Sequence, residues 1–504
     1  ERAADLGRHF ALGGDAARAL DYLVLAGDQR YDGFAYVDAG EAYRRALRLL
    51  PAAPPRKRLA LDRKLNDRLG RIGFYEDHHA APPHLERARA LHLRHGLLWG
   101  IPRLAGVLGA RLAVALCLTA TVIAGALRGR ARPLREALEH LLDAFAATAY
   151  LCNCYTYTGR QARALEEAEV LRPLIYSRRR LPRAGYLIAR GPALVFTHRL
   201  HAGAAACEEA LAVLERDRRT LVAEPDRVNA TGGALVTRLW ADLGRGYCQS
   251  PWWPRVEEYV RRHPTVLLET WLLELRLFTA YRRGYFAAAR GLWQQLAEKA
   301  RLSAVFFVQG KGRVWHGLAA LGAGLTGEAL DVAEEVIGLA REHDNPMVQA
   351  MGLHLRGMAL HAWEHHDQAA RAFEQAAALA LREDVDAHGV YRDALLAHAA
   401  LALDLGRAAE ARALVARAEE ATPPVEPPHE LHRLRALRLR GQIAQAEGEP
   451  AAARAALLQA LELAELLEDA REAGLTAHAL SGVLVELGEA EQAVERDAQA
   501  RRLL

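Results

Sequence analysis

A helix-contact signature that recurs along the chain constrains its fold more than any other feature. The signature is a small residue, a bulky apolar residue four positions later, a small residue three after that and a helix stop five further on, as in Ala39, Tyr43, Ala46 and Pro51. In a helix the first three positions share one face, so the small residues let a neighbouring helix approach while the bulky one fills the gap. The small residue that opens each match is Ala39, Ala81, Ala164, Ala206, Ala289, Ala329, Ala369, Ala411, Ala453 and, in a degraded copy, Ala493.

These anchor alanines are regularly spaced. Neighbouring anchors lie 40 to 42 residues apart, except for two steps of 83 residues. Each long step equals two ordinary steps with one signature missing, near residues 123 and 248. An alanine-rich chain produces single matches by chance, so the regular step is the stronger evidence. Because repetition at such a period is typical of repeat proteins, the sequence predicts a continuous array of stacked helix pairs.

The most complete copies show both helices of a pair. In the copy that ends near Leu381, the residues Leu353, Gly357 and Leu360 precede the anchor at the spacing of a first contact face. This pattern resembles the tetratricopeptide repeat, whose usual period is about 34 residues. The longer step implies longer helices or loops in each pair.

Two segments, YVDAGEAYRRALRLLP and LALDLGRAAEARALVARAEEA, carry a narrower resemblance. They are similar to the carboxy-terminal helical region of large bacterial signalling ATPases of the STAND type, including those joined to nucleotide cyclase, kinase or transcription-factor modules. The resemblance implies a noncatalytic interaction and sensor scaffold that binds a protein or peptide on its concave face. A small-ligand-binding regulatory domain and a membrane-associated scaffold are the alternatives.

We therefore expect an all-α, right-handed α-solenoid over residues 1–504, with subdivisions at 1–96, 97–133, 134–421 and 429–504. Between the last two lies the proline-rich stretch 422–428, which reads as a stiff linker or hinge. The chain starts at Glu1 without a methionine and enters the array in mid-pattern. An upstream nucleotide-binding domain in the same chain is accordingly expected.

Composition fits an ordinary soluble protein, with 51% hydrophobic and 25% charged residues. The net charge is only +4 and basic residues are interleaved with acidic ones, so nucleic-acid binding is not favoured. Five scattered cysteines show no disulfide spacing. Reduced thiols and a cytoplasmic location are the expectation.

Two motifs come close to known catalytic patterns. Gly310, Lys311 and Gly312 suggest a phosphate-binding loop, but the position five residues before the lysine is Phe306 and no Ser or Thr follows. We expect a turn between helices there. His361, Glu364 and His365 spell the H-x-x-E-H of zinc proteases, yet the repeat places them where one helix turns into the next. The sequence thus predicts no catalytic residue, no cofactor and no metal site.

The first missing signature falls in the most apolar stretch of the chain. Residues 112–127 carry no charge and are bounded by Arg111 and by Arg128, Arg130 and Arg132. A membrane-spanning helix needs about 20 apolar residues, so this length favours a helix buried on all sides. The alternative is a segment that contacts a membrane or a partner, with the arginines facing anionic headgroups.

The second missing signature falls at the segment GYCQSPWWPRVEEYV. Two prolines bracket Trp252 and Trp253, so an extended loop should precede the next helix. A tryptophan wedge that closes a gap between repeats is one interpretation. The other is a partner-binding surface, because exposed aromatic residues often anchor partners. Its candidate residues are Tyr247, Trp252, Trp253 and Arg255.

Overall fold

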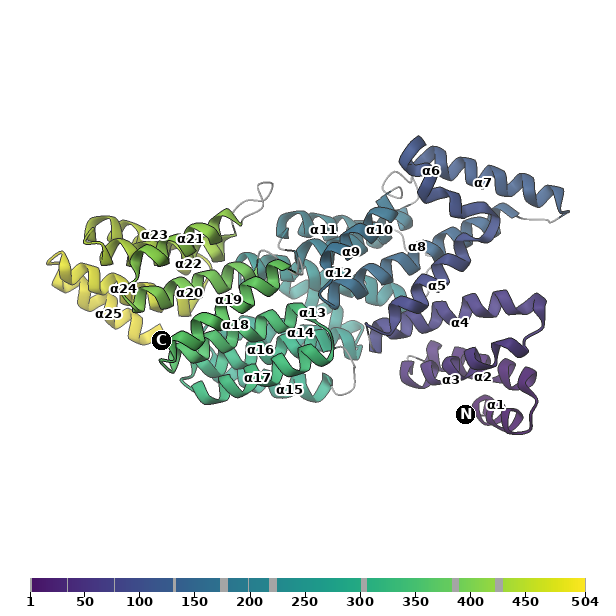
Figure 1. Ribbon diagram of the computed structural model, residues 1–504, viewed down its shortest axis with the longest axis horizontal. Helices are drawn as coiled ribbons and strands as arrows, with labels where there is room; N and C mark the ends of the chain where they lie inside the picture. The colour runs from purple at the N-terminus through teal and green to yellow at the C-terminus, as the bar shows by residue number, and fades with distance from the viewer. Residues whose placement is uncertain are drawn as a thin grey trace.

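The computed structural model describes residues 2–503 apart from 34, 77, 130–132, 173–179, 198, 217–223, 301–305, 383–388 and 422–428. The described residues form helices and turns, without a strand. After α1 (Arg2–Leu12), the helices follow one another in antiparallel pairs (Figure 1). The proline-rich stretch 422–428 lies outside the described residues.

The first helices of the pairs are α2 (Ala16–Asp32), α4 (Pro55–Glu76), α6 (Ile101–Leu108), α8 (Pro133–Tyr157), α10 (Arg180–Val195), α12 (Glu224–Arg245), α14 (Val266–Arg282), α16 (Phe306–Gly322), α18 (Pro346–Ala362), α20 (Val390–Asp404), α22 (Glu430–Ala446) and α24 (Ala470–Glu486). The second helices are α3 (Tyr36–Leu49), α5 (Ala81–Leu93), α7 (Ala110–Leu127), α9 (Gln161–Leu171), α11 (Leu200–Arg216), α13 (Trp253–Arg262), α15 (Phe286–Ala300), α17 (Thr326–Glu342), α19 (His366–Arg382), α21 (Ala408–Glu420), α23 (Pro450–Leu466) and α25 (Ala490–Leu503). Two short 3-10 helices, η1 (Leu50–Ala52) and η2 (His95–Gly100), follow α3 and α5.

The predicted all-α solenoid is confirmed. Every anchor alanine lies in the first turns of a second helix, and none is more than 6% exposed. The bulky residue of the signature is buried in five copies, at Tyr43, Leu85, Phe373, Val415 and Leu457. In three others the same position holds an alanine, at Ala168, Ala210 and Ala333, and Trp293 is only partly buried. A methyl group added at Gly27 of α2 would lie 2.4 Å from the ring of Tyr43 on α3, so the small residue is what lets the two helices approach.

The pair α6–α7 occupies the place of the first missing signature, but outside the stack. Helix α5 packs directly against α8, so the array continues without this pair. The pair lies at the upper right edge of the molecule in Figure 1. The expectation of a helix buried on all sides is therefore wrong for residues 112–127: Leu112, Leu116 and Ile123 are 45–55% exposed.

The pair α12–α13 occupies the place of the second missing signature, inside the stack. Helix α12 packs against α11 on one side and α14 on the other. Helix α13 has only ten residues and begins at Trp253. The signature is absent because this short helix makes the contact of the pair with different residues, Val256 and Val260.

Successive turns of the superhelix touch. Arg160 bonds to Asp344, Arg245 to Glu430 and Arg282 to Asp469, and the partners are 184 to 187 residues apart in the chain. With a step of 40 to 42 residues, one turn holds between four and five helix pairs. These contacts join helix ends at the rim of one turn to helix ends at the rim of the next.

Among the described helices, none has the length and apolar character needed to cross a membrane.

Candidate binding cavity

A cavity of about 900 Å³ lies inside the superhelix. Most of its lining residues come from the first helices of eight consecutive pairs, α10 to α24. Ligand pockets in proteins usually have volumes of about 300 to 1,000 Å³. The cavity is therefore large enough for a short peptide or a sizeable small molecule, and its eight lining pairs span more than one turn of the superhelix.

One wall of the cavity is aromatic. The ring centroids of Trp240 and Phe278 are 5.1 Å apart, and those of Phe278 and Trp315 are 4.7 Å apart. The methionines Met351 and Met358 from α18 extend this wall. Flexible thioethers next to rigid rings give a surface that adapts to apolar side chains.

The other wall carries a cluster of arginines from α22 and α24. Glu472 accepts from Arg435 Nε at 3.1 Å and from Arg438 Nε at 3.0 Å, and Arg471 Nη1 lies 3.5 Å from it. Arg435 Nη1 also donates to Asp393 of α20 at 2.7 Å. Three guanidinium groups thus share two carboxylates, and we call these five residues the arginine cluster.

The arginine cluster has an excess positive charge at neutral pH. The arginines lower the pKa of Glu472 to about 2 against the effect of its burial. Arg435 and His432 hold the pKa of Asp393 far below its usual range, again against burial. Both carboxylates are consequently ionised, and three guanidinium charges face only two negative ones. The wall therefore favours an anionic group in the cavity.

The expectation of a turn at Gly310–Gly312 is wrong. These residues lie inside α16, and Lys311 is buried with its Nζ 2.9 Å from Glu274 Oε1 on α14. The ammonium group lies 4.3 Å from the ring centroid of Trp240, a distance that gives a cation–π interaction. Burial raises the pKa of Glu274, and Lys311 opposes that shift. Lys311 therefore neutralises Glu274 and packs against the ring of Trp240 in the aromatic wall.

The H-x-x-E-H motif lies at a turn, as predicted. Helix α18 ends at Ala362, α19 begins at His366, and Glu364 between them has a φ of 59°. His361 Nε2 lies 2.8 Å from Asp404 on the next pair. His361 therefore lies in the last turn of α18 and His365 in the connection that follows, so the two histidines do not share one helix face.

The predicted surface residues Tyr247, Trp252, Trp253 and Arg255 are only partly brought together. Trp252 lies near the guanidinium groups of Arg238 and Arg255, at 5.1 and 4.4 Å from its ring centroid. Trp253 Nε1 donates to the carbonyl oxygen of Cys248 at 3.0 Å. Tyr247 points elsewhere, since its hydroxyl bonds to Glu430 of the next turn at 3.0 Å.

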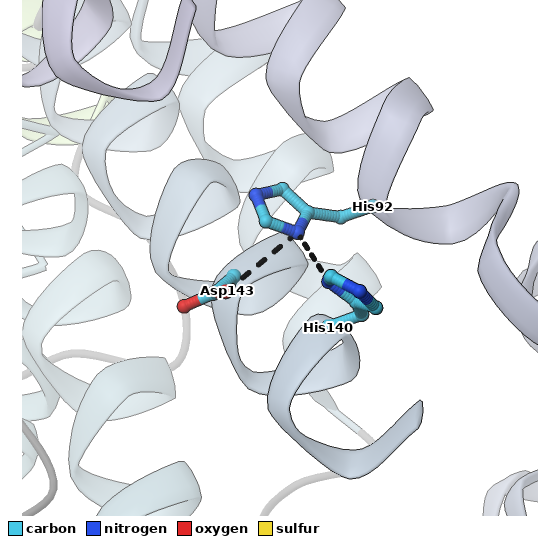
Figure 2. A group of neighbouring side chains, drawn as sticks. All are labelled: His92, His140 and Asp143. Carbon is cyan, nitrogen blue, oxygen red and sulfur yellow. Dashed lines mark hydrogen bonds and ion pairs between the residues drawn. The ribbon is translucent and has the colours of Figure 1, made fainter. Parts of the chain in front are cut away.

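Figure 2 shows one further group, which could hold a metal ion by its spacing alone. His92 of α5 lies with its Nδ1 3.1 Å from His140 Nδ1 and 3.7 Å from Asp143 Oδ2, both on α8. Burial, with nearby positive charge, lowers the pKa of His92 and of His140 to about 3, so both rings are neutral at pH 7. Two neutral imidazoles and a carboxylate are suitable ligands for a transition metal.

The hydrogen bonds around this group oppose a metal ion. Arg63 Nη1 lies 3.0 Å from His140 Nε2. Because a guanidinium group only donates, His140 Nε2 must accept and its proton sits on Nδ1, where it is donated to His92. A metal ion would have to displace that proton and the arginine. We interpret the group as a polar link between α4, α5 and α8.

Comparison with known proteins bears on the fold. No protein family model and no curated protein sequence matches the chain. Among solved structures, the complex of a Rap protein with Competence and Sporulation Factor has a TM-score of 0.52 at 10% identity, covering 71% of this chain and 97% of that one. The chain has the fold of a tetratricopeptide-like repeat protein.

Two further structures are similar over much of their length. The anaphase-promoting-complex hetero-tetramer Cut9–Hcn1 has a TM-score of 0.43 at 13% identity, covering 96% of this chain and 87% of that one. Aspartyl phosphate phosphatase F from Bacillus subtilis has a TM-score of 0.42 at 10% identity, covering 71% and 93%. At such identities these proteins are neighbours in fold alone.

Proposed function

We propose that this chain is a noncatalytic interaction module that binds a short peptide segment of a partner protein inside its cavity. The observation that carries the proposal is that an aromatic wall and the arginine cluster line the same cavity of about 900 Å³. Tetratricopeptide-like solenoids are built to present such extended concave surfaces. The peptide would place an acidic side chain or its terminal carboxylate on the arginine cluster and apolar side chains on Trp240 and Trp315.

Arg438 and Arg471 are the residues through which an anionic group would be recognised. Their side chains are 12% and 25% exposed, whereas Glu472 between them is 3% exposed. An incoming carboxylate can therefore approach the arginines from the cavity without displacing Glu472. Hydrogen bonds to a charged group contribute about 1.5 to 3 kcal/mol each, which corresponds to at least a tenfold effect on affinity.

The proposal is tested with a displayed library of random seven-residue peptides, followed by fluorescence anisotropy on the enriched sequences. We expect enrichment of peptides that combine an acidic group with apolar residues. Arg438→Gln and Arg471→Gln should each weaken binding about tenfold or more. Arg371→Gln, on the exposed side of α19, is the matched control and should leave the affinity unchanged.

Two results would count against a peptide site. One is a library from which the chain enriches nothing above an unrelated protein. The other is equal binding by the arginine-cluster variants and the control variant. Binding of small anionic molecules without any peptide binding would favour the alternative, a small-ligand regulatory domain.

We propose further that the module is the regulatory arm of a larger bacterial signalling ATPase of the STAND type. Support comes from the resemblance of its repeat segments and from the closed turn, which a ligand could favour over an open one. By linkage, a ligand biases a nucleotide switch only if it binds one state more tightly. Reading the gene upstream of residue 1 tests this, and an upstream sequence without a nucleotide-binding motif would contradict it.

The surface formed by Trp252 and Arg255 stays a separate proposed contact for a protein partner. Both residues are partly or fully exposed, although Arg255 Nη2 is paired with Glu215 at 2.6 Å. Trp253 would support it through its hydrogen bond to the carbonyl oxygen of Cys248, whereas Tyr247, bonded to Glu430, lies apart from it. Once a partner is found, Trp252→Ala should weaken its binding; unchanged affinity would remove this surface from consideration.

A further inference from the structure

Helix α7 carries no charge after Arg111, yet it is not covered on every side. Its inner face, with Ala113, Cys117 and Thr121, is buried where the helix packs on η2, α6 and α8. Its outer face remains at the surface because α5 and α8 pack directly on each other and leave the pair outside the stack. A helix of this composition is usually covered by protein or lipid.

The exposed residues form a stripe. Leu112, Leu116, Ile123 and Leu127 are 49%, 45%, 55% and 84% exposed. At 3.6 residues per turn their spacings of four, seven and four residues keep them on one side of the helix. Over these residues α7 rises about 22 Å. We call this set the α7 stripe; contiguous apolar surface of this kind marks an interaction site.

The charged residues of the α6–α7 pair itself, Arg103 and Arg111, have one sign. From Arg87 to Arg135 the chain contains nine arginines and no aspartate or glutamate, although acidic and basic residues are nearly balanced overall, at 62 and 66. Six of the nine lie between positions 94 and 132, on the α6–α7 pair or next to it in the sequence. Acidic residues begin again with Glu136 and Glu139 on α8. Trp99 of η2, next to the pair in the chain, is 50% exposed and lies under the guanidinium group of Arg103 at 5.5 Å.

We propose that the α6–α7 pair docks on an anionic lipid bilayer, with α7 lying in the plane of the interface and its stripe among the acyl chains. The pair shares apolar side chains, a neighbouring tryptophan and nearby arginines with helices that bind this way. Anionic headgroups supply negative charge opposite the arginines, and each basic residue near such a surface strengthens binding. The helix lies on the membrane instead of crossing it, in line with its length.

A second copy of this chain fits the stripe less well. Two α7 helices packed against each other would bring the arginines of both pairs together, and the α6–α7 pair has no carboxylate of its own to neutralise them. A protein partner would need an apolar groove with an acidic rim, whereas an anionic bilayer presents both properties by itself. The lipid surface is therefore the occupant that the charge pattern favours.

The experiment is flotation of the whole chain with phosphatidylcholine vesicles, with and without 30% phosphatidylglycerol. We expect the chain to float with the anionic vesicles and to bind pure phosphatidylcholine far more weakly. Raising sodium chloride from about 0.05 to 0.5 M should reduce binding to the anionic vesicles at least tenfold. Leu116→Glu and Ile123→Glu should each reduce binding to anionic vesicles at least tenfold. Arg128→Glu should reduce it several-fold.

Val494→Glu is the matched control, because Val494 is a 70% exposed apolar residue on α25, far along the chain. It should bind vesicles as the unchanged chain does, and circular dichroism establishes that all variants are folded. The proposal is overturned if the chain does not float with anionic vesicles, or if it binds neutral vesicles equally well. It is also overturned if Ile123→Glu abolishes a dimer seen by light scattering while vesicle binding is unaffected.

Discussion

His354 of α18 lines the cavity in a setting that opposes its protonation. Burial, together with the nearby charges of Arg435 and Arg471, lowers its pKa to about 4, and Asp393 offsets only part of this. In the unfolded chain the pKa returns to about 6.5. Between these values the unfolded state binds more protons, so stability falls as the pH drops. We expect this one group to remove about 2 kcal/mol of stability between pH 7 and pH 5.

His354→Asn is the test, because asparagine does not titrate in this range. Urea unfolding of both proteins at pH 7 and pH 5 gives the two differences in stability. The variant should lose less stability than the parent on acidification, whatever its stability at pH 7. If both proteins lose the same amount, the imidazole is already protonated or solvated in the folded state.

Sequence reasoning at the level of single residues failed where a partner lies far along the chain. The glycines around Lys311 were interpreted as a turn, but they permit close packing inside α16: a methyl group at Gly310 would lie 2.6 Å from Val348 of α18. Glu274, which neutralises the lysine, belongs to the preceding pair. Likewise Arg435 and Arg438, three residues apart on α22, gain significance only because Glu472 of α24 lies between them.

Helix elements, by contrast, could be predicted well. The anchors located the second helix of nearly every pair because the residues that make the signature are those that pack within the pair. Where the anchors failed, helices are still present: α7 and α13 contact their neighbours through other residues. The sequence could not show that α7 would lie outside the stack, because that depends on α5 meeting α8.

A pair of glycine substitutions tests the packing rule within one region. A methyl group at Gly357 of α18 would lie 2.5 Å from the ring of Phe373 on α19, which is 1% exposed and cannot move aside. At Gly338 of α17 there is nothing within 4 Å of that position. We expect Gly357→Ala to destabilise by about 1 to 3 kcal/mol and Gly338→Ala to stabilise by about 0.5 to 1 kcal/mol.

Thermal melting of the two variants and the parent provides the measurement. The two melting midpoints should shift in opposite directions. Because both substitutions replace a helical glycine by alanine, the gain in helix propensity is the same, and the difference between the two shifts reports the packing contact at Gly357. Stabilisation by both substitutions would show that α18 and α19 can separate without cost.

At the scale of the whole molecule, contacts between turns distinguish this chain from a simple solenoid. In a simple array each repeat contacts only its neighbours. Local unfolding of one helix pair therefore does not destabilise a pair several repeats away. Here the ends of α14 and α24 are joined by an ion pair whose members are each 2% exposed: Arg282 and Asp469, 2.7 Å apart. No periodicity in the sequence indicates this closure, because it depends on the curvature accumulated over a full turn.

Removing one member of that pair should therefore weaken both turns at once. Arg282→Met leaves Asp469 buried without its cation, at a cost of about 3 to 5 kcal/mol. Asp469→Asn in the same chain should restore much of this, because asparagine carries no charge and can still cap α24 through the bond that Asp469 Oδ1 accepts from Glu472 N at 3.0 Å.

Hydrogen exchange measured by mass spectrometry distinguishes a closed superhelix from a simple array. In Arg282→Met, exchange should accelerate in α14 and also in α23 and α24, and the added Asp469→Asn should slow both again. Arg276→Met is the matched control: Arg276 also lies on α14, but it is 45% exposed and pairs with Glu257 of the neighbouring α13. Its effect should stay near α13 and α14. Acceleration confined to α14 in Arg282→Met would mean that the turns separate freely and that the cavity between them is open in solution.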